Sequence, residues 1–356
     1  MNFYYSASDI PSPFYGLTKH KIGHRQFLYL DNGWTKKENY FFKGISSSWC
    51  KIFFDPTIRI ETNKLRDFPI YYNNDTISNF KKLDKTVPVD GLIEIDKEIN
   101  ITYQENFYPN INSKQISFKD CHNILFDALI ENVSTFHSQN KKLVLIPVQN
   151  GIDTLTVRSV FDFLDIRYDT FDLPSKQPQM SRVGTELAKN HWGFRQLQEK
   201  EDSVIVTGYY GDEWILRNPY YAHVILSGRG VNITEEFDKT ENCYMKGFFE
   251  KNYRKKCSKS SDTSIEKLMT QICNDFQIWH LHNTYFFSPL KQMSLLALLS
   301  ADTDTILRQI TNAELSRSII EKCNPALISL IDREKNYKDP LWFDKPPVEI
   351  STMRSN

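Results

Sequence analysis

Two short polar segments carry residue types that could bind a phosphate group and a divalent cation. The first is QNGIDT (149–154), in which Gly151 would let the backbone come close to a ligand and Asp153 could hold a cation. The second is TGYYGDE (207–213), which ends in two carboxylates. Mg²⁺ is typically held by one or two protein carboxylates, while water and phosphate oxygens complete its octahedron. Asp153 would form such a pair with Asp212 or Glu213 if the two segments meet.

The first segment lies between a predicted strand and a predicted helix. Residues 143–148 form a short continuous apolar run, which is typical of a strand buried on both faces. After the turn, apolar residues recur at helical spacing, at Val157, Val160, Phe161 and Leu164. A loop from a strand into a helix points its free N–H groups and the positive end of the helix dipole beyond the sheet edge, which favours phosphate. The alternative is an ordinary turn in which Asp153 caps the helix.

Predicted strands and helices alternate around both segments. Strands at 168–173 and 203–208 follow the first helix, with a further helix predicted at 183–198. This alternation indicates right-handed βαβ units in a parallel sheet. Ligands of such sheets bind beyond the carboxyl ends of the strands. Both polar segments are therefore expected at the same edge.

The rest of the chain divides by composition. Residues 1–115 predict stacked antiparallel sheets, because aromatic and β-branched runs there are broken by Asn, Asp, Gly and Pro. Helical spacing begins at residues 117–136 and returns over 263–333, while the polar residues 230–262 predict an insertion. We expect two domains, with the second covering residues 116–356.

Length and charge limit the classes of function. The chain has 356 residues, 40% of them hydrophobic, which is enough for two cores. Lys plus Arg and Asp plus Glu both number 44, so no overall field favours nucleic acid or an acidic membrane. No apolar run approaches the roughly 18 to 20 residues that span a bilayer, so we expect no membrane partner.

Cysteine usage and overall composition bear on the compartment. The six cysteines form no CxxC pair, and the first residues lack the apolar core of a signal peptide, which predicts reduced thiols in a cytoplasmic protein. The abundance of Asn, Lys, Ile, Tyr and Phe is typical of an AT-rich genome, such as that of a virus. Neither observation indicates an oligomeric state.

Several motifs resemble the asparagine synthetase and β-lactam synthetase family, which belongs to the PP-loop ATP pyrophosphatases. NGIDT (150–154) resembles the SGGxDS loop of the pyrophosphatases, and VTGYYGDE (206–213) is similar to the family's SGxGxDE segment. Residues 286–310 and 318–337 resemble its two distal helical motifs. RDFPIYYNND (66–75) resembles a hairpin of the family's amino-terminal glutaminase-type domain. Order and rough spacing hold over most of the chain.

The resemblance implies a fold and a reaction. It implies a degenerate glutaminase-type (Ntn) β-sandwich over residues 1–115. Residues 116–356 would form a PP-loop domain with a doubly wound parallel sheet, of the adenine nucleotide alpha hydrolase kind. Mg·ATP would activate a carboxylate as an acyl-adenylate with release of pyrophosphate, and an amine would then form the amide. The substrates would be small-molecule or peptide carboxylates and amines.

The resemblance also implies roles for single residues. Asp153 and Asp212 are the implied Mg²⁺ ligands. The implied nucleotide-binding residues are Gln149, Asn150, Gly151, Asp153, Thr154 and Gly208. Lys335, in DREKNY, matches the lysine that neutralises charge developing on phosphate and acyl oxygens, and Arg333 would support it.

Several positions depart from the family pattern. Gln149 and Asn150 stand in place of Ser-Gly, so a side chain lies where the family keeps the backbone bare, although Asn tolerates left-handed conformations. Tyr209 replaces the family's common glutamate and could act as a catalytic hydrogen-bond donor or base partner. Residue 2 is Asn where the glutaminases have a nucleophilic Cys, so we do not expect the amine to be ammonia from glutamine.

Two other interpretations fit the same residues. The altered loop and the lost glutamate favour a catalytically inactive relative that keeps the fold for binding or regulation. A PP-loop enzyme that modifies a nucleic acid is the second alternative, but zero net charge and the lack of a CxxC pair make nucleic acid an unexpected partner. His280 and His282 do not share a helix face, so we expect no metal site there. Cys243 and Cys257 lack a His at catalytic spacing.

Overall fold

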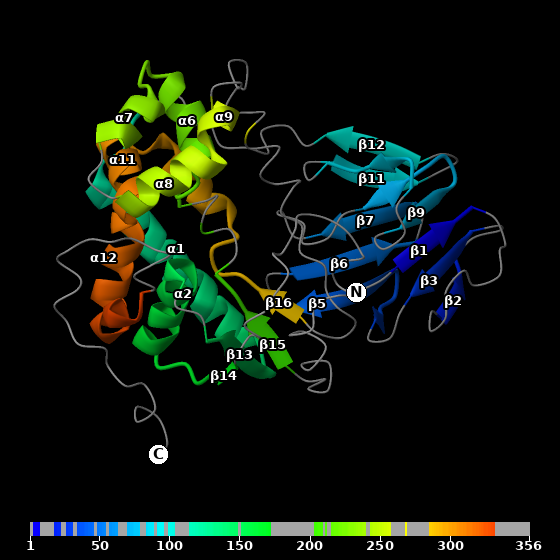
Figure 1. Ribbon diagram of the computed structural model, residues 1–356. Helices are drawn as coiled ribbons and strands as arrows, with labels where there is room; N and C mark the ends of the chain where they lie inside the picture. Colours follow the sequence, from blue (N-terminus) through cyan, green and yellow to red (C-terminus); the bar gives the residue numbers. More distant parts are fainter. Residues whose placement is uncertain are drawn as a thin grey trace.

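The computed structural model places a β-rich amino-terminal part beside a part that contains a parallel sheet and helices (Figure 1). The structure describes residues 3–7, 18–22, 26–30, 34–45, 48–54, 57–62, 70–78, 83–88, 91–95, 99–103, 114–148, 151–171, 203–208, 211, 215–239, 243–257, 268 and 285–331. The predicted helix at 183–198 lies outside these residues.

The amino-terminal part contains two six-stranded sheets, and all their strand pairs are antiparallel, as predicted. The first sheet has the order β10-β8-β9-β1-β3-β2, formed by Lys85–Thr86, Tyr71–Tyr72, Thr76–Ser78, Phe3–Ser6, Phe27–Leu30 and Thr18–Lys21. The second has the order β12-β11-β7-β6-β5-β4, formed by Ile99–Tyr103, Gly91–Ile95, Ile58–Thr62, Ser48–Phe53, Tyr40–Ile45 and Thr35–Lys36.

Side chains from both of these sheets form one hydrophobic cluster. Alternation decides which residues enter it: in β11, Ile93 and Ile95 are buried while Leu92 and Glu94 are exposed. Tyr5 of the first sheet and residues of the second, Ile93 among them, belong to this same cluster. A second cluster starts with Cys121 and contains the helices and the parallel sheet.

The parallel sheet has four strands in the order β14-β13-β15-β16. They are formed by Asp169–Phe171, Leu143–Pro147, Ser203–Val206 and Tyr285–Phe287. The first three confirm predicted strands. The fourth contradicts the helical prediction for 263–333, because the aromatic run at β16 pairs with β15 and Phe287 stacks on Phe136 at 4.0 Å between ring centroids.

Both faces of the two central strands are buried. Val144 and Val204 point into the helical core, and Leu145 and Ile205, which alternate with them, are buried on the opposite face. This confirms the interpretation of the 143–148 run as a strand covered on both sides over residues 144–147, whereas Leu143 and Val148 are exposed. At the sheet's edge, β16 contacts β6 of the amino-terminal part (Figure 1).

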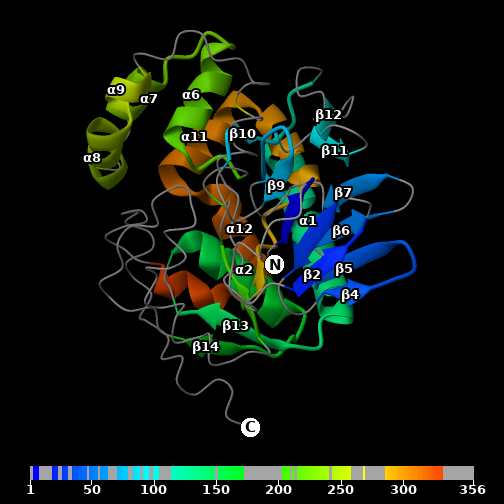
Figure 2. The same cartoon turned by 90° about the vertical axis from the view of Figure 1, so that its right-hand side faces the viewer.

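Helices α1, α2 and α12 pack together beside the sheet. Helices α6 to α9 lie farther from the sheet, at the top left of Figure 2. Their bounds are Phe118–Gln139 for α1, Ile152–Phe163 for α2, Pro219–Ser227 for α6, Ile233–Lys239 for α7, Cys243–Asn252 for α8, Arg254–Cys257 for α9, Thr303–Asn312 for α11 and Glu314–Cys323 for α12. Two 3₁₀ helices flank α11 and α12: η1 at Met293–Ser300 precedes α11, and η2 at Pro325–Leu330 follows α12. The polar stretch predicted as an insertion contains α7, α8 and α9. The rings of Phe237 and Phe249 stack there, with 4.3 Å between their centroids, and both residues belong to the helical core.

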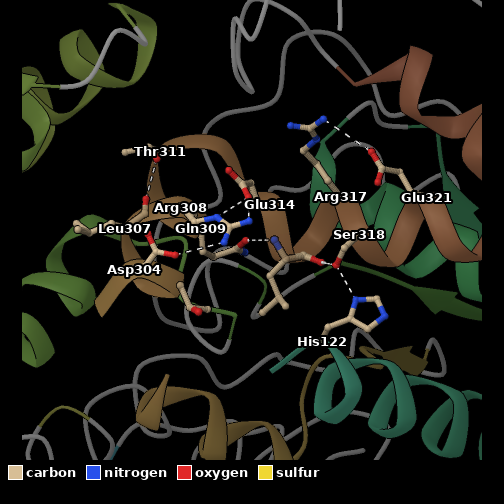
Figure 3. Close-up of polar contacts among 12 residues, drawn as sticks. His122, Asp304, Leu307, Arg308, Gln309, Thr311, Glu314, Arg317, Ser318 and Glu321 are labelled. Atoms are coloured by element: carbon tan, nitrogen blue, oxygen red, sulfur yellow. Dashed lines mark hydrogen bonds and ion pairs between the residues drawn. The ribbon is translucent and has the colours of Figure 1, made fainter. Parts of the chain in front are cut away.

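Helix α12, which packs on α2, begins with a cap supplied by the preceding helix (Figure 3). Its own N-cap, Ala313, has φ 51° and no side chain that can accept a hydrogen bond. Gln309 of α11 is fully buried, and its Oε1 accepts from the Leu315 N–H at 2.8 Å while its Nε2 donates to Ser316 Oγ at 3.1 Å. Gln309 thus satisfies an N–H group that the helix start would otherwise leave without a partner.

Among the described helices, none is both long enough and apolar enough to cross a membrane.

Candidate functional site

The strand order places a ligand-binding position between β13 and β15. The chain runs from β13 to β14 on one side and then returns to β15 on the other. In open parallel sheets, ligands bind beyond the carboxyl ends of the strands where the order reverses in this way. The loops that leave β13 and β15 are the ones that contain the two polar segments. Their predicted position at a common edge is confirmed.

Gly151 is the N-cap of α2 and, having no side chain, donates no capping group to this helix end. Its φ of −67° and ψ of 131° are ordinary extended values, so the backbone does not require glycine at this position. Within the described part of the chain, a Cβ atom on Gly151 would meet nothing within 4 Å. The missing side chain therefore leaves open space beside the amino-terminal end of the helix.

Asp153 lies in the first turn of α2 and is not its cap. The second loop lies directly against it. A Cβ on Gly208 would stand 2.5 Å from the Asp153 carbonyl carbon and from the Thr154 nitrogen. A Cβ on Gly211 would overlap the Asp153 carboxyl group. Only glycine at these two positions allows the loop after β15 to pack on the start of α2.

The Asp153 carboxylate is paired with Arg217, a residue that the motifs did not single out. Arg217 Nη1 donates to Asp153 Oδ1 at 2.5 Å, and the two side chains are only 10% and 20% exposed. The pair joins residues 64 positions apart in the sequence. The only local signal for it was a basic residue four positions after the acidic pair of the second segment.

A strained residue directs Arg217 toward Asp153. Leu216 has φ 59°, in the left-handed region that disfavours a residue with a branched side chain, and it is fully buried. Asn218 then caps α6 by accepting from the Tyr220 N–H at 3.0 Å, and Pro219 occupies the first helical turn. Arg217 therefore lies between two fixed residues, the buried Leu216 and the helix cap Asn218.

Small polar side chains are buried at the same edge. Thr154, Thr207 and Ser288 are each less than a tenth exposed. The Thr207 N–H donates to the Phe287 carbonyl oxygen at 2.9 Å, which continues the pairing of β15 and β16 beyond the strand ends. Thr154, predicted to bind a nucleotide, has its side chain in the protein interior.

The structure brings together Gly151, Asp153, Thr154 and Gly208 of the predicted site. The other predicted residues lie outside the described part of the chain: Gln149, Asn150, Tyr209, Asp212, Arg333 and Lys335. His280 and His282 lie outside it as well.

A divalent cation does not fit the described residues as they are arranged. Among them, no group of three or more His, Cys, Asp and Glu side chains is placed to hold a metal. Asp153, the predicted ligand within this set, already carries the guanidinium group of Arg217 on one oxygen. The carboxylate is therefore already neutralised by a cation of the chain itself.

Other reactive groups of the helical core have structural roles. Burial raises the pKa of Cys121 to about 12 and that of Cys323 to about 11, which keeps both thiols protonated and unreactive near neutral pH. His122 Nδ1 lies 2.7 Å from Ser318 Oγ (Figure 3). That hydroxyl donates its single proton to the Leu315 carbonyl oxygen at 2.8 Å, so it accepts from His122 and links α1 to α12 rather than acting as a nucleophile.

Comparison with known proteins finds no matching family model and no significantly similar curated protein, so the function of this site must be argued from its own residues.

Proposed function

We propose that this chain binds ATP at the carboxyl edge of its parallel sheet and uses it to activate a carboxylate. The carboxylate oxygen would attack the α-phosphorus, pyrophosphate would leave, and an amine other than ammonia from glutamine would displace AMP to form an amide. Activation works because AMP is a far better leaving group than hydroxide. In this proposal residues 116–356 form a PP-loop domain and residues 1–115 a degenerate glutaminase-type β-sandwich.

One observation carries the proposal: two glycine-containing loops meet around Asp153 where the strand order reverses. The uncapped start of α2 offers N–H groups and the positive end of a helix dipole, which suit phosphate oxygens. Gly151 leaves open space beside them. Mg²⁺ belongs to the proposal as an ion that would arrive with ATP and be held by phosphate oxygens and Asp212, because Arg217 already engages the Asp153 carboxylate. Lys335, Arg333 and Tyr209 are the proposed catalytic residues.

A second candidate function is nucleotide binding without turnover. The Arg217–Asp153 pair favours it, because the carboxylate predicted from the sequence to bind Mg²⁺ is engaged by an arginine of the same chain. A protein of this kind would use the site for binding or regulation. A role in modifying a nucleic acid gains no support from the described residues.

Thermal unfolding with ATP separates these candidates. A ligand at about 100 times its dissociation constant adds about 2.7 kcal/mol of apparent stability. We expect ATP to raise the unfolding temperature of the native chain and to have a much smaller effect on Gly151→Ala. The added methyl group enters the open space beside the helix N–H groups and meets no protein atom within 4 Å, so the unliganded stability should hardly change.

Pyrophosphate release with mixtures of acids and amines then tests for turnover. Release that depends on both substrates supports the ligase. Binding of ATP with no pyrophosphate release supports the second candidate. No stabilisation of the native chain by millimolar ATP would contradict both.

A further inference from the structure

We propose that Arg217 is the resident cation of Asp153 and excludes a divalent metal ion from this carboxylate. This deepens the proposed function, because it concerns the cation of the same site, but it does not require that ATP binds. Its basis is the arrangement of charges and backbone around Asp153.

The guanidinium group already occupies a carboxylate oxygen to which a metal ion would bind. Arg217 Nη1 is 2.5 Å from Asp153 Oδ1, and both side chains are largely buried. Mg²⁺ binds carboxylate oxygens at about 2.0 to 2.1 Å, so an ion on the same oxygen would stand roughly 4 to 5 Å from the arginine. Two cations at that distance in a partly buried site repel each other strongly.

The backbone packs against the carboxylate at the same oxygen, Oδ1, that Arg217 holds. Gly211 lies so close to the Asp153 carboxyl group that a Cβ would overlap it, and Gly208 lies against the backbone of Asp153 and Thr154. The Gly211 N–H donates to the Gly208 carbonyl oxygen at 3.3 Å, which forms the turn that brings both glycines over α2. Asp153 therefore cannot turn away from Arg217 without displacing this loop.

The neighbouring residues restrict the position of Arg217. Leu216 adopts a left-handed conformation and Asn218 caps α6, so the residue between them has little freedom to move away. Strain of this kind persists only where the surrounding structure imposes it. The site is therefore arranged to keep a positive charge at Asp153 in the absence of any metal.

Mn²⁺ binding measured by electron paramagnetic resonance tests this proposal, with Mn²⁺ alone as the probe. A neighbouring unit charge shifts the proton affinity of a carboxylate by roughly one to three orders of magnitude. We therefore expect Arg217→Met to bind Mn²⁺ at least about tenfold more tightly than the native chain. The gain should disappear in Asp153→Asn/Arg217→Met.

Two further variants serve as controls. Arg217→Gln removes the charge but keeps a hydrogen-bond donor for the carboxylate, so it should show the same gain if the methionine variant fails to fold. Lys19→Met removes an exposed positive charge that lies over the Phe27 ring, 4.3 Å from its centroid, and should leave Mn²⁺ binding unchanged. Circular dichroism confirms that each variant is folded.

Each other outcome overturns the proposal. Equal Mn²⁺ affinity in the native chain and the folded Arg217 variants would mean that the arginine does not exclude the ion. Absence of Mn²⁺ binding in all of them would mean that Asp153 is not a latent metal ligand, and a gain that survives loss of Asp153 would place the ion elsewhere. ATP binding in EDTA, measured on the same proteins, reports on the proposed function separately, since it can fail while the Mn²⁺ result holds.

Discussion

Replacing Gly208 by alanine should destabilise the protein by about 2 kcal/mol. The added Cβ would lie 2.5 Å from two backbone atoms of α2, at Asp153 and Thr154, whereas ordinary contacts begin near 3.4 Å. Backbone atoms cannot rotate away, so the cost should fall toward the upper part of the roughly 1 to 3 kcal/mol typical of overpacking. Reduced freedom of the unfolded chain offsets this by about 0.4 to 1 kcal/mol.

The matched control is Gly151→Ala, at the other loop of the same site. No atom lies within 4 Å of its added Cβ, and its φ of −67° is open to alanine. A modest loss at the N-cap and the gain from the unfolded state should nearly cancel, to within about 0.5 kcal/mol.

Thermal unfolding of both variants, without ligand, measures the difference. About 2 kcal/mol corresponds to a fall of roughly 4 to 8 °C for a unit of roughly 150 to 250 residues. Equal stability of Gly208→Ala and Gly151→Ala would refute the close packing of the two loops.

Three further predictions concern the site and the helices that support it. Asp153→Asn and Arg217→Met should each cost about 2 to 3 kcal/mol, somewhat below the roughly 3 to 5 kcal/mol for breaking a fully buried pair, because both side chains keep some exposure. Denaturant unfolding of both variants and of their combination should show a double variant that costs clearly less than the sum, and additive costs would contradict the pairing. Gln309→Met should cost about 2 to 4 kcal/mol in the same assay, because it leaves the buried Ser316 hydroxyl and the Leu315 N–H without their Gln309 partner. Thr311→Ala, on the same helix, should change little. Burial and then Lys322 lower the pKa of His122, so the folded chain takes up this proton at a lower pH than the unfolded chain, and the free energy of unfolding should fall as the pH drops below about 6.5. His122→Gln should make that fall shallower in unfolding curves measured between about pH 7 and pH 5, and an unchanged slope would exclude this histidine as a contributor.

The meeting of the two loops could be predicted from the sequence because it depends on local patterns. The continuous apolar run of β13 and the helical spacing of α2 define a strand, a turn and a helix, and the second segment follows another apolar strand. Parallel strands bring their carboxyl ends to one edge, so the contact follows from topology alone. The space beside Gly151 is open among the described residues, and its role in binding a ligand stays a prediction.

The features that were missed depend on contacts between distant residues. The sequence around β16 is typical of a helical region, and it becomes a strand because β15 is available for pairing and Phe136 for stacking. Helices α7 to α9 lie in a polar stretch whose few aromatic residues meet only in the folded core. The partner of Asp153 could not be inferred either, because a leucine at position 216 does not signal the left-handed turn that directs Arg217.

The 64-residue separation between Asp153 and Arg217 has a consequence for how the protein matures during translation. Chains emerge from the ribosome at about 5 to 20 residues per second, so the aspartate is exposed for several seconds before its arginine exists. During that interval α2 and β13 can form, but their carboxylate has no countercharge from β15 or its loop. Cations of the surrounding solution have access to the Asp153 carboxylate only until Arg217 pairs with it.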